Sequence, residues 1–177
     1  MTVVREIDES AGDEPERLAS TDAAFGEWVA PHLSALWALA AHEVGSAAAD
    51  DVVQESLLRA WRRWSTYDPL RGTARAWLVA IVLDRSRRHR VRRRPETSVP
   101  ASTELRDAGP DVAMRVGIEQ AVRGLPARQR QVVVLYYLAD LALADVAALL
   151  NVSQGAVKAQ LFDARANLRR LLEDHDG

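Results

Sequence analysis

Seven arginines lie between Arg85 and Arg94, and no acidic residue stands among them. The guanidinium group is planar and permanently charged, and its N–H donors match phosphate oxygens in pairs. The chemistry that this segment offers is therefore phosphate binding, which favours a nucleic acid as the partner. A solvated basic surface is the alternative, because runs of like charge are often only that.

Catalytic chemistry has no comparable support in the sequence. The four histidines share no metal-ligand spacing, and there is no glycine-rich phosphate loop and no nucleophile elbow. The chain also has no cysteine, which excludes disulfides and thiolate metal sites. The sequence thus predicts a protein that is not an enzyme and has no metal and no cofactor.

The arginines must be carried by a helix. Residues 76–83 are apolar, the arginines follow directly, and Pro95 ends the segment. Apolar residues on all sides of a helix indicate burial, and a helix usually stops before a proline. We expect one helix that begins in a core and ends with a basic, exposed half.

Charge is strongly segregated, although the net charge is only −2. Residues 59–94 hold twelve arginines and two aspartates, whereas residues 1–22 hold seven acids and two arginines. The local field of the basic segment is what attracts a polyanion. We interpret residues 1–22 as a disordered acidic tail, either without function or masking the arginines.

Composition places the chain among globular proteins. With 177 residues and 48% hydrophobic content it can bury one core or two small ones. The N-terminus lacks a secretory signal pattern, and no apolar run is long enough to cross a bilayer. The sequence therefore predicts a cytoplasmic protein with no membrane insertion.

Two further helices are expected before the arginine-ended one. Apolar residues recur with helical spacing over 25–44, with a break near Ala30 because of Pro31. The same periodicity runs over 49–64, with Asp50 or Asp51 as the N-cap. We expect these helices to pack on a core of tryptophans, namely Trp28, Trp37, Trp61, Trp64 and Trp77.

The rest of the chain predicts a linker and a second helical domain. Residues 95–111 are rich in Pro, Ser and Thr and indicate a flexible linker. Helices are then expected over 112–122, 128–138 and 143–150, and from Gln154 onward. Asn151 suits a left-handed turn and Ser153 suits an N-cap, so the last two helices form a helix-turn-helix.

Three segments in this order resemble bacterial RNA polymerase sigma factors of the extracytoplasmic-function (ECF) group. They are ADDVVQESLLRAW at 49–61, RAWLVAIVLDRSRRHRVRRR at 75–94, and the segment 125–172 that contains the helix-turn-helix. The resemblance implies an all-α fold of two small helical domains joined by a flexible linker. A region 2-like domain would span 23–94, a region 4-like domain 112–172, and a short tail 173–177.

The resemblance also implies the partners and site residues of the first domain. The helix at 49–61 would bind the β′ clamp of core RNA polymerase through Asp51, Gln54 and Glu55. The basic helix and the loop before it would handle the −10 element of promoter DNA. The residues expected to contact its backbone are Arg71, Arg75, Arg85, Arg88 and Arg92.

The second domain would bind the −35 element and the β flap. Helical geometry places Gly155, Ala159, Phe162, Asp163 and Ala166 outermost on the recognition helix, which is unusual for a reader of the major groove. We therefore expect weaker or altered recognition of the −35 element. It would depend on Gln154, Lys158 and Gln160 for bases and on Arg165 and Arg169 for phosphates.

The function that follows is a sigma factor that directs promoter-specific transcription initiation and is held by an anti-sigma factor. The alternative is a stand-alone helix-turn-helix transcriptional regulator. A pure interaction protein, such as a sigma antagonist, is disfavoured by the segregated positive charge. A free regulator has no need for the helix at 49–61, so binding to core polymerase separates the first two.

Overall fold

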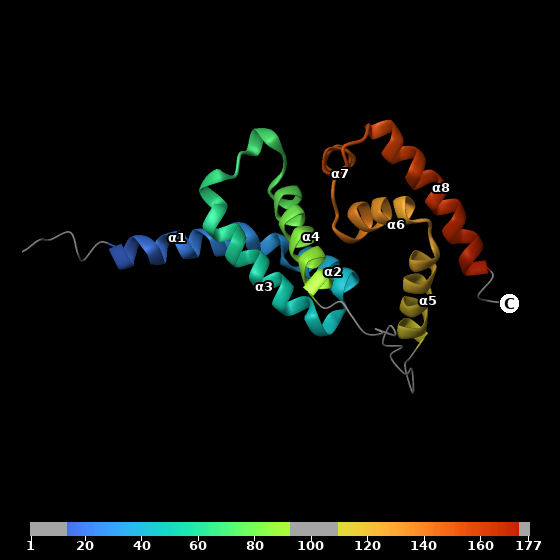
Figure 1. Ribbon diagram of the computed structural model, residues 1–177, viewed down its shortest axis with the longest axis horizontal. Helices are drawn as coiled ribbons and strands as arrows, with labels where there is room; N and C mark the ends of the chain where they lie inside the picture. The colour runs from blue at the N-terminus through green and yellow to red at the C-terminus, as the bar shows by residue number, and fades with distance from the viewer. Residues whose placement is uncertain (1–13, 93–109, 174–177) are drawn as a thin grey trace, which may run out of the picture. The chain divides into compact units, whose positions relative to one another are not determined.

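The structure is a computed structural model that describes residues 14–92 and 110–173. Within these ranges it consists of helices joined by short turns and contains no strand (Figure 1). The prediction of an all-α fold is confirmed. The expected linker at 95–111 and the first part of the expected acidic tail lie largely outside the described residues.

The backbone divides into two units after Ser34. The first contains α1 (Glu14–Val29) and a 3₁₀ turn at Ala30–His32. Helix α1 begins within the segment that we expected to be disordered.

The predicted break at Pro31 is present as the 3₁₀ turn. Proline cannot donate the hydrogen bond that would continue the preceding helix. Aromatic side chains pack against one another between α1 and this turn. The ring centroids of Phe25 and Trp28 are 5.9 Å apart, and those of Trp28 and His32 are 6.4 Å apart with the rings edge to face.

Helix α2 (Leu33–Val44) begins two residues before the division, and most of it belongs to the second unit. Helices α3 (Ser46–Arg63) and α4 (Ala74–Arg92) follow it. Helices α3 and α4 pack against each other (Figure 1). The buried side chains are mainly aliphatic and include Leu36, Leu39, Val52, Leu78, Val79 and Val82.

The expected tryptophan core is wrong, because none of Trp28, Trp37, Trp61, Trp64 and Trp77 is buried. Trp37 is 41% exposed and Trp61 is 37% exposed, so neither is a core residue. The indole N–H of Trp37 donates to the carboxylate of Asp50 at 2.8 Å, which keeps one edge of the ring at the surface. The polar N–H of an indole favours such half-buried positions.

The expected caps of α3 are also wrong. The helix begins at Ser46 after Gly45, whose φ of 85° is a left-handed conformation that glycine adopts without strain. Asp50 and Asp51 therefore lie in the second turn of α3. The run of small residues Ser46–Ala49 has good helix propensity and extends the helix toward Gly45.

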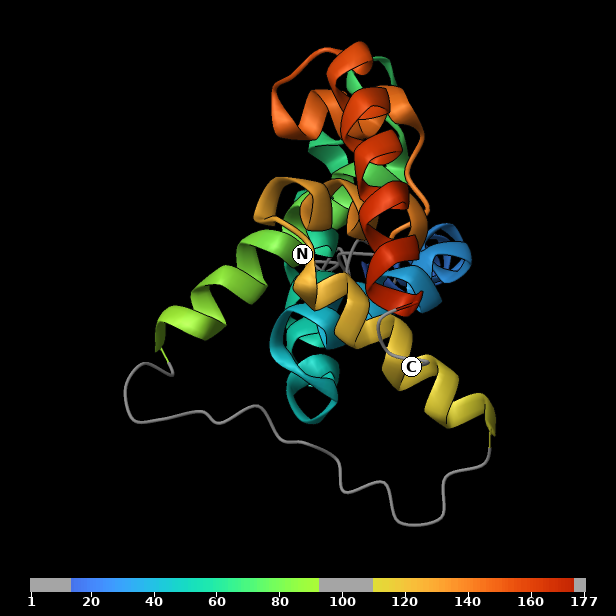
Figure 2. The ribbon, with the colours of Figure 1, turned by 90° about the vertical axis from the view of Figure 1, so that its right-hand side faces the viewer.

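Four further helices follow: α5 (Pro110–Gly124), α6 (Ala127–Val133), α7 (Leu143–Leu150) and α8 (Gln154–Glu173). Helix α8 packs on the other three, and Figure 2 shows it beside α5. Its buried residues Val157, Leu161 and Ala164 belong to the apolar face that the sequence predicts.

The expected helix at 128–138 differs in its second half. After α6 the backbone continues as a π-helical turn, Val134–Leu138, and Asp140 two residues later has a φ of 52°. A π-helical turn inserts one extra residue per turn and changes which side chains face the core. Val134 and Leu135 are buried there, whereas Tyr137 is exposed.

Candidate nucleic-acid interface

Helix α4 carries the predicted arginines as far as Arg92, and Arg93 and Arg94 lie outside the described residues. The hydroxyl of Thr73 accepts a hydrogen bond from the backbone N–H of Ala76 at 3.2 Å and so caps the helix start. The first half of α4 is buried through its side chains Leu78, Val79 and Val82. The side chains of Arg87, Arg88, Arg90 and Arg92 are exposed in the second half.

Acidic side chains already pair with several of the predicted DNA-binding arginines. Arg85 forms an ion pair with Glu55 of α3, and only 17% of its side chain is exposed. Arg88 pairs with Asp84 on its own helix at 3.1 Å, and Arg59 of α3 approaches the same carboxylate at 3.9 Å. Arg75 forms an ion pair with Asp140. In this structure the basic surface is therefore partly neutralised.

Arg71 and Arg92 differ from these residues in position. Arg71 is exposed in the loop between α3 and α4, at the end of a 3₁₀ turn (Pro69–Arg71) that Asp68 caps through a 2.9 Å bond to the N–H of Leu70. Arg92 is exposed at the last residue of α4. Leu70, which the sequence reasoning did not single out, is 95% exposed beside Arg71.

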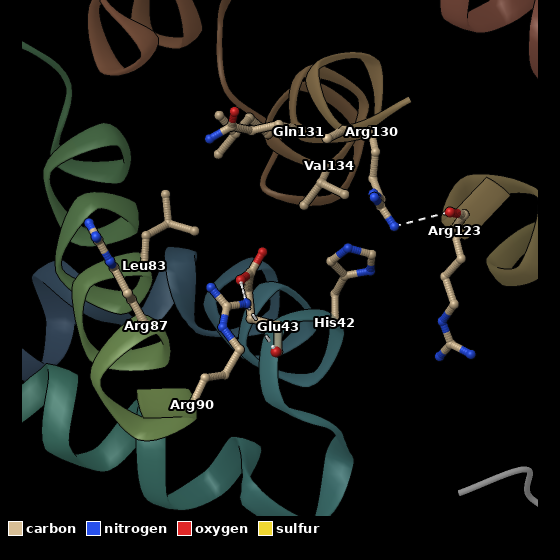
Figure 3. A pocket seen from close by; sticks show the side chains of 11 residues that line it. His42, Glu43, Leu83, Arg87, Arg90, Arg123, Arg130, Gln131 and Val134 are labelled. Carbon is tan, nitrogen blue, oxygen red and sulfur yellow. Dashed lines mark hydrogen bonds and ion pairs between the residues drawn. The ribbon is translucent and has the colours of Figure 1, made fainter. Parts of the chain in front are cut away.

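Arg90 is held against α2. Its guanidinium donates to the backbone oxygen of Glu43 at 3.3 Å and forms an ion pair with the Glu43 carboxylate (Figure 3). Arginine in the last turn of a helix also interacts favourably with the helix dipole. Arg90 thus ties the basic end of α4 to the end of α2.

His42 lies next to Glu43 in the last turn of α2 (Figure 3). Burial lowers the pKa of the His42 imidazole below its ordinary value, because it disfavours the charged form. The carboxylate of Glu43 acts in the opposite direction but does not outweigh burial.

The three predicted polymerase-binding residues share one exposed side of α3. Asp51, Gln54 and Glu55 are exposed, whereas Val52, Val53 and Ser56 are buried. Leu58 is 56% exposed one turn after Gln54 and Glu55. Sequence reasoning did not single out Leu58, although an apolar residue off the buried face was the available signal.

The helix-turn-helix forms as predicted. Asn151 adopts a left-handed conformation with φ 53° and ψ 49° and ends α7. The hydroxyl of Ser153 accepts a hydrogen bond from the backbone N–H of Ala156 at 3.1 Å, which makes it the N-cap of α8. The predicted roles of both residues are confirmed.

The outward side of α8 carries the predicted −35 residues. Gln154, Lys158, Arg165 and Arg169 are exposed, and Gln160 is half-buried. The Nε of Arg165 donates to the hydroxyl of Tyr137 at 2.8 Å, and its guanidinium carbon lies 5.8 Å from the centre of the same ring. Sequence reasoning missed Tyr137, since no local pattern links residues so far apart in the chain.

Comparison with known proteins finds two family models that match this chain. Residues 28–96 match the family model for Sigma-70 region 2, and residues 115–168 match that for Sigma-70, region 4. The chain is 32% identical over 151 residues to the ECF RNA polymerase sigma factor SigL of Mycobacterium tuberculosis. That match covers 81% of this chain and 85% of SigL.

A second relative has a solved structure. The RNA polymerase sigma factor CnrH of Cupriavidus metallidurans is 34% identical over 168 residues, which cover 85% of this chain and 87% of CnrH. The structure of CnrH in complex with the cytosolic domain of CnrY superposes with a TM-score of 0.65 at 30% identity. The superposition covers 86% of this chain and 90% of the matched chain in that structure.

Within residues 14–92 and 110–173, each helix is too short or too polar to span a bilayer.

Proposed function

Because the chain belongs to the ECF RNA polymerase sigma factors, we propose that it binds core RNA polymerase through α3 and promoter DNA through α4 and α8. The observation that carries this proposal is the presence of a region 2 match and a region 4 match, in that order, in one chain. A sigma factor directs initiation at specific promoters, and the polymerase carries out the chemistry.

The polymerase-binding surface is the exposed side of α3. Asp51, Gln54 and Glu55 offer carboxylate and amide groups, which suit a basic partner such as the β′ clamp helices. Exposed Leu58 adds apolar area next to these groups. Apolar area surrounded by polar groups is the usual composition of a protein interface.

The surface for the −10 element comprises α4 and the loop before it. Arg71, Arg88 and Arg92 are exposed, and Arg88 must release Asp84 to contact a phosphate. Arg75 and Arg85 already have acidic partners, so DNA must compete with those carboxylates. Such contacts provide affinity that does not depend on sequence and that falls as the salt concentration rises.

The surface for the −35 element is the outward side of α8. Gln154, Lys158 and Gln160 are the side chains proposed to reach base edges, and Arg165 and Arg169 are proposed to contact phosphates. The second helix of a helix-turn-helix enters the major groove with its N-terminal residues toward the bases, which fits the placement of the first three. The same domain is proposed to contact the β flap.

An anti-sigma factor is the proposed regulatory partner. The solved structure of CnrH holds the cytosolic domain of CnrY, and CnrH is similar to this chain over most of its length. We therefore propose that a comparable protein binds this chain and withholds it from core polymerase.

Reconstitution with core RNA polymerase tests the proposal. The chain should be retained on immobilised core enzyme, and the resulting holoenzyme should initiate at discrete sites on genomic DNA, as transcript start mapping would show. Combined D51A, Q54A and E55A substitutions should reduce retention at least tenfold. The matched control is Glu119→Ala, which removes an exposed acid on α5.

Two results would contradict the proposal. One is the failure of the holoenzyme to initiate at specific sites. The other is tight, sequence-specific duplex binding by the free chain together with no retention on core enzyme, which would identify a stand-alone regulator instead.

A further inference from the structure

Phe162 projects from the outward side of α8. Its side chain is 72% exposed, which is unusual for a phenylalanine in a folded domain. The residues one turn away on the same side are small, namely Ala159 and Ala166, and Gly155 lies two turns before it. The ring therefore stands above its surroundings and is not part of the apolar face of Val157, Leu161 and Ala164.

Few hydrogen-bond donors surround this ring. Ala159 and Ala166 have no polar side-chain atoms, and the Asp163 carboxylate can only accept. Arg165 is turned toward Tyr137, with its Nε engaged by the hydroxyl of that residue. The bidentate contacts by which Arg, Asn or Gln usually distinguish bases are thus sparse at the centre of this surface.

Cations nevertheless flank the ring. Lys158 lies one turn before Phe162 and Arg165 nearly one turn after it, and both are exposed. Residues spaced by three or four positions are neighbours on a helix surface. A protruding apolar group between two positive charges is complementary to a groove with phosphates along its rims and apolar groups on its floor.

The major groove of DNA provides such a floor wherever thymine occurs, because only thymine carries a C5-methyl group there. We propose that Phe162 contacts thymine methyl groups in the upstream promoter element, which adds an apolar base contact to those proposed for Gln154, Lys158 and Gln160. The inference depends on the proposed role of α8 as the helix that enters the duplex. It adds the residue that sets specificity and the base that this residue selects.

A protein partner is the other occupant that an exposed phenylalanine could serve. The flanking charges favour DNA, since Lys158, Arg165 and Arg169 outnumber the single acid Asp163 on this side of α8. Arginine and lysine around a reading surface are typical of phosphate-contacting helices.

The test uses the reconstituted holoenzyme and a promoter duplex whose upstream element has been randomised at six positions. Selected duplexes are then resynthesised with deoxyuridine in place of single thymines, which removes the methyl group and leaves the base-pairing edge unchanged. Loss of one buried methyl contact should lower affinity about fourfold at the thymine that Phe162 contacts.

Variants assign the effect to the ring. F162A should select thymine less often and should bind thymine and deoxyuridine duplexes equally. F162L should retain part of the difference. The matched control is Ile118→Ala, which removes an exposed apolar side chain from α5 and should leave the fourfold ratio unchanged.

The inference is overturned if wild-type holoenzyme selects no thymine, shows equal affinity for both duplexes at each thymine, or keeps the ratio in F162A. Weaker core-enzyme retention by F162A, with an unchanged affinity ratio in the holoenzyme that still forms, would assign the ring to a protein interface. If the holoenzyme initiates at specific sites but binds the thymine and deoxyuridine duplexes equally, only the proposed contact of Phe162 with thymine is refuted. A holoenzyme that initiates nowhere refutes the proposed function as well.

Discussion

At the scale of single residues, Asp163 is the least expected feature of the recognition helix. It is exposed on the outward side of α8, where DNA phosphates would approach. A carboxylate in that position repels phosphate, although it can accept a hydrogen bond from the amino group of cytosine. Its charge should therefore limit the affinity for upstream DNA.

Replacing Asp163 with arginine should increase the affinity of the holoenzyme for the upstream element. The added cation should also steepen the dependence of log affinity on log salt concentration by about one unit, as one more phosphate contact would. Titration of a labelled promoter duplex at several salt concentrations measures both quantities. D163N removes the charge without adding a cation and should give an intermediate affinity, whereas unchanged affinity in D163R would mean that this side of α8 does not face DNA.

At the scale of elements, the helix-turn-helix was predictable because its determinants are local. Asn151 and Ser153 specify the turn through their own backbone and side-chain preferences, and both act as expected. The start of α3 was not predictable from the same rules. Asp50 has the right residue type for a cap, but the glycine before Ser46 starts the helix and Asp50 bonds to Trp37 instead.

Helix α7 lacks the cap that its neighbour α8 has. Ala142 occupies the N-cap position with an extended backbone, and no side chain there satisfies the free N–H groups. Serine at this position could accept from the first turn, with Asp145 placed to complete a capping box. A142S should raise the free energy of unfolding by about 1 kcal/mol.

Urea unfolding followed by circular dichroism measures this change. The control is Ala144→Ser, which introduces the same hydroxyl at an exposed position inside α7. It should be slightly destabilising, because serine has a lower helix propensity than alanine. Equal effects of the two substitutions would show that capping is not the cause.

At the scale of the whole molecule, the sequence sufficed for the fold class and for the order of the two helical groups, since both depend on periodicity and segregated charge. The pairing of distant residues was not predictable. Arg165 of α8 contacts Tyr137 of the π-helical turn, and Arg85 of α4 contacts Glu55 of α3. Such pairs depend on how the helices pack, and the spacing of residues within one segment of the sequence does not predict that packing.

The global stability should depend on pH through His42. Burial lowers the pKa of its imidazole in the folded state, and the cations Arg123 and Arg130 act in the same direction against Glu43. The unfolded chain then binds more protons than the folded one as pH falls below about 6.5. The contribution of His42 to stability should thus be constant above that pH and decrease below it.

Urea unfolding at pH 7.5 and pH 5.5 tests this expectation for the wild type and for His42→Gln. Glutamine does not titrate in this range, so the variant should lose less stability on acidification than the wild type. An identical loss in both proteins would exclude His42 as the source.

The ion pair between Glu55 and Arg85 joins a residue proposed for polymerase binding to one proposed for DNA binding. If the clamp captures Glu55, Arg85 loses its carboxylate and becomes free for phosphate, and by thermodynamic reciprocity bound phosphate frees Glu55 for the clamp. E55Q should therefore weaken core binding while raising the affinity of the isolated chain for DNA a few-fold at low salt, as filter binding would measure. Binding of the core enzyme and binding of promoter DNA would then each increase the affinity for the other, because both break the same Glu55–Arg85 ion pair.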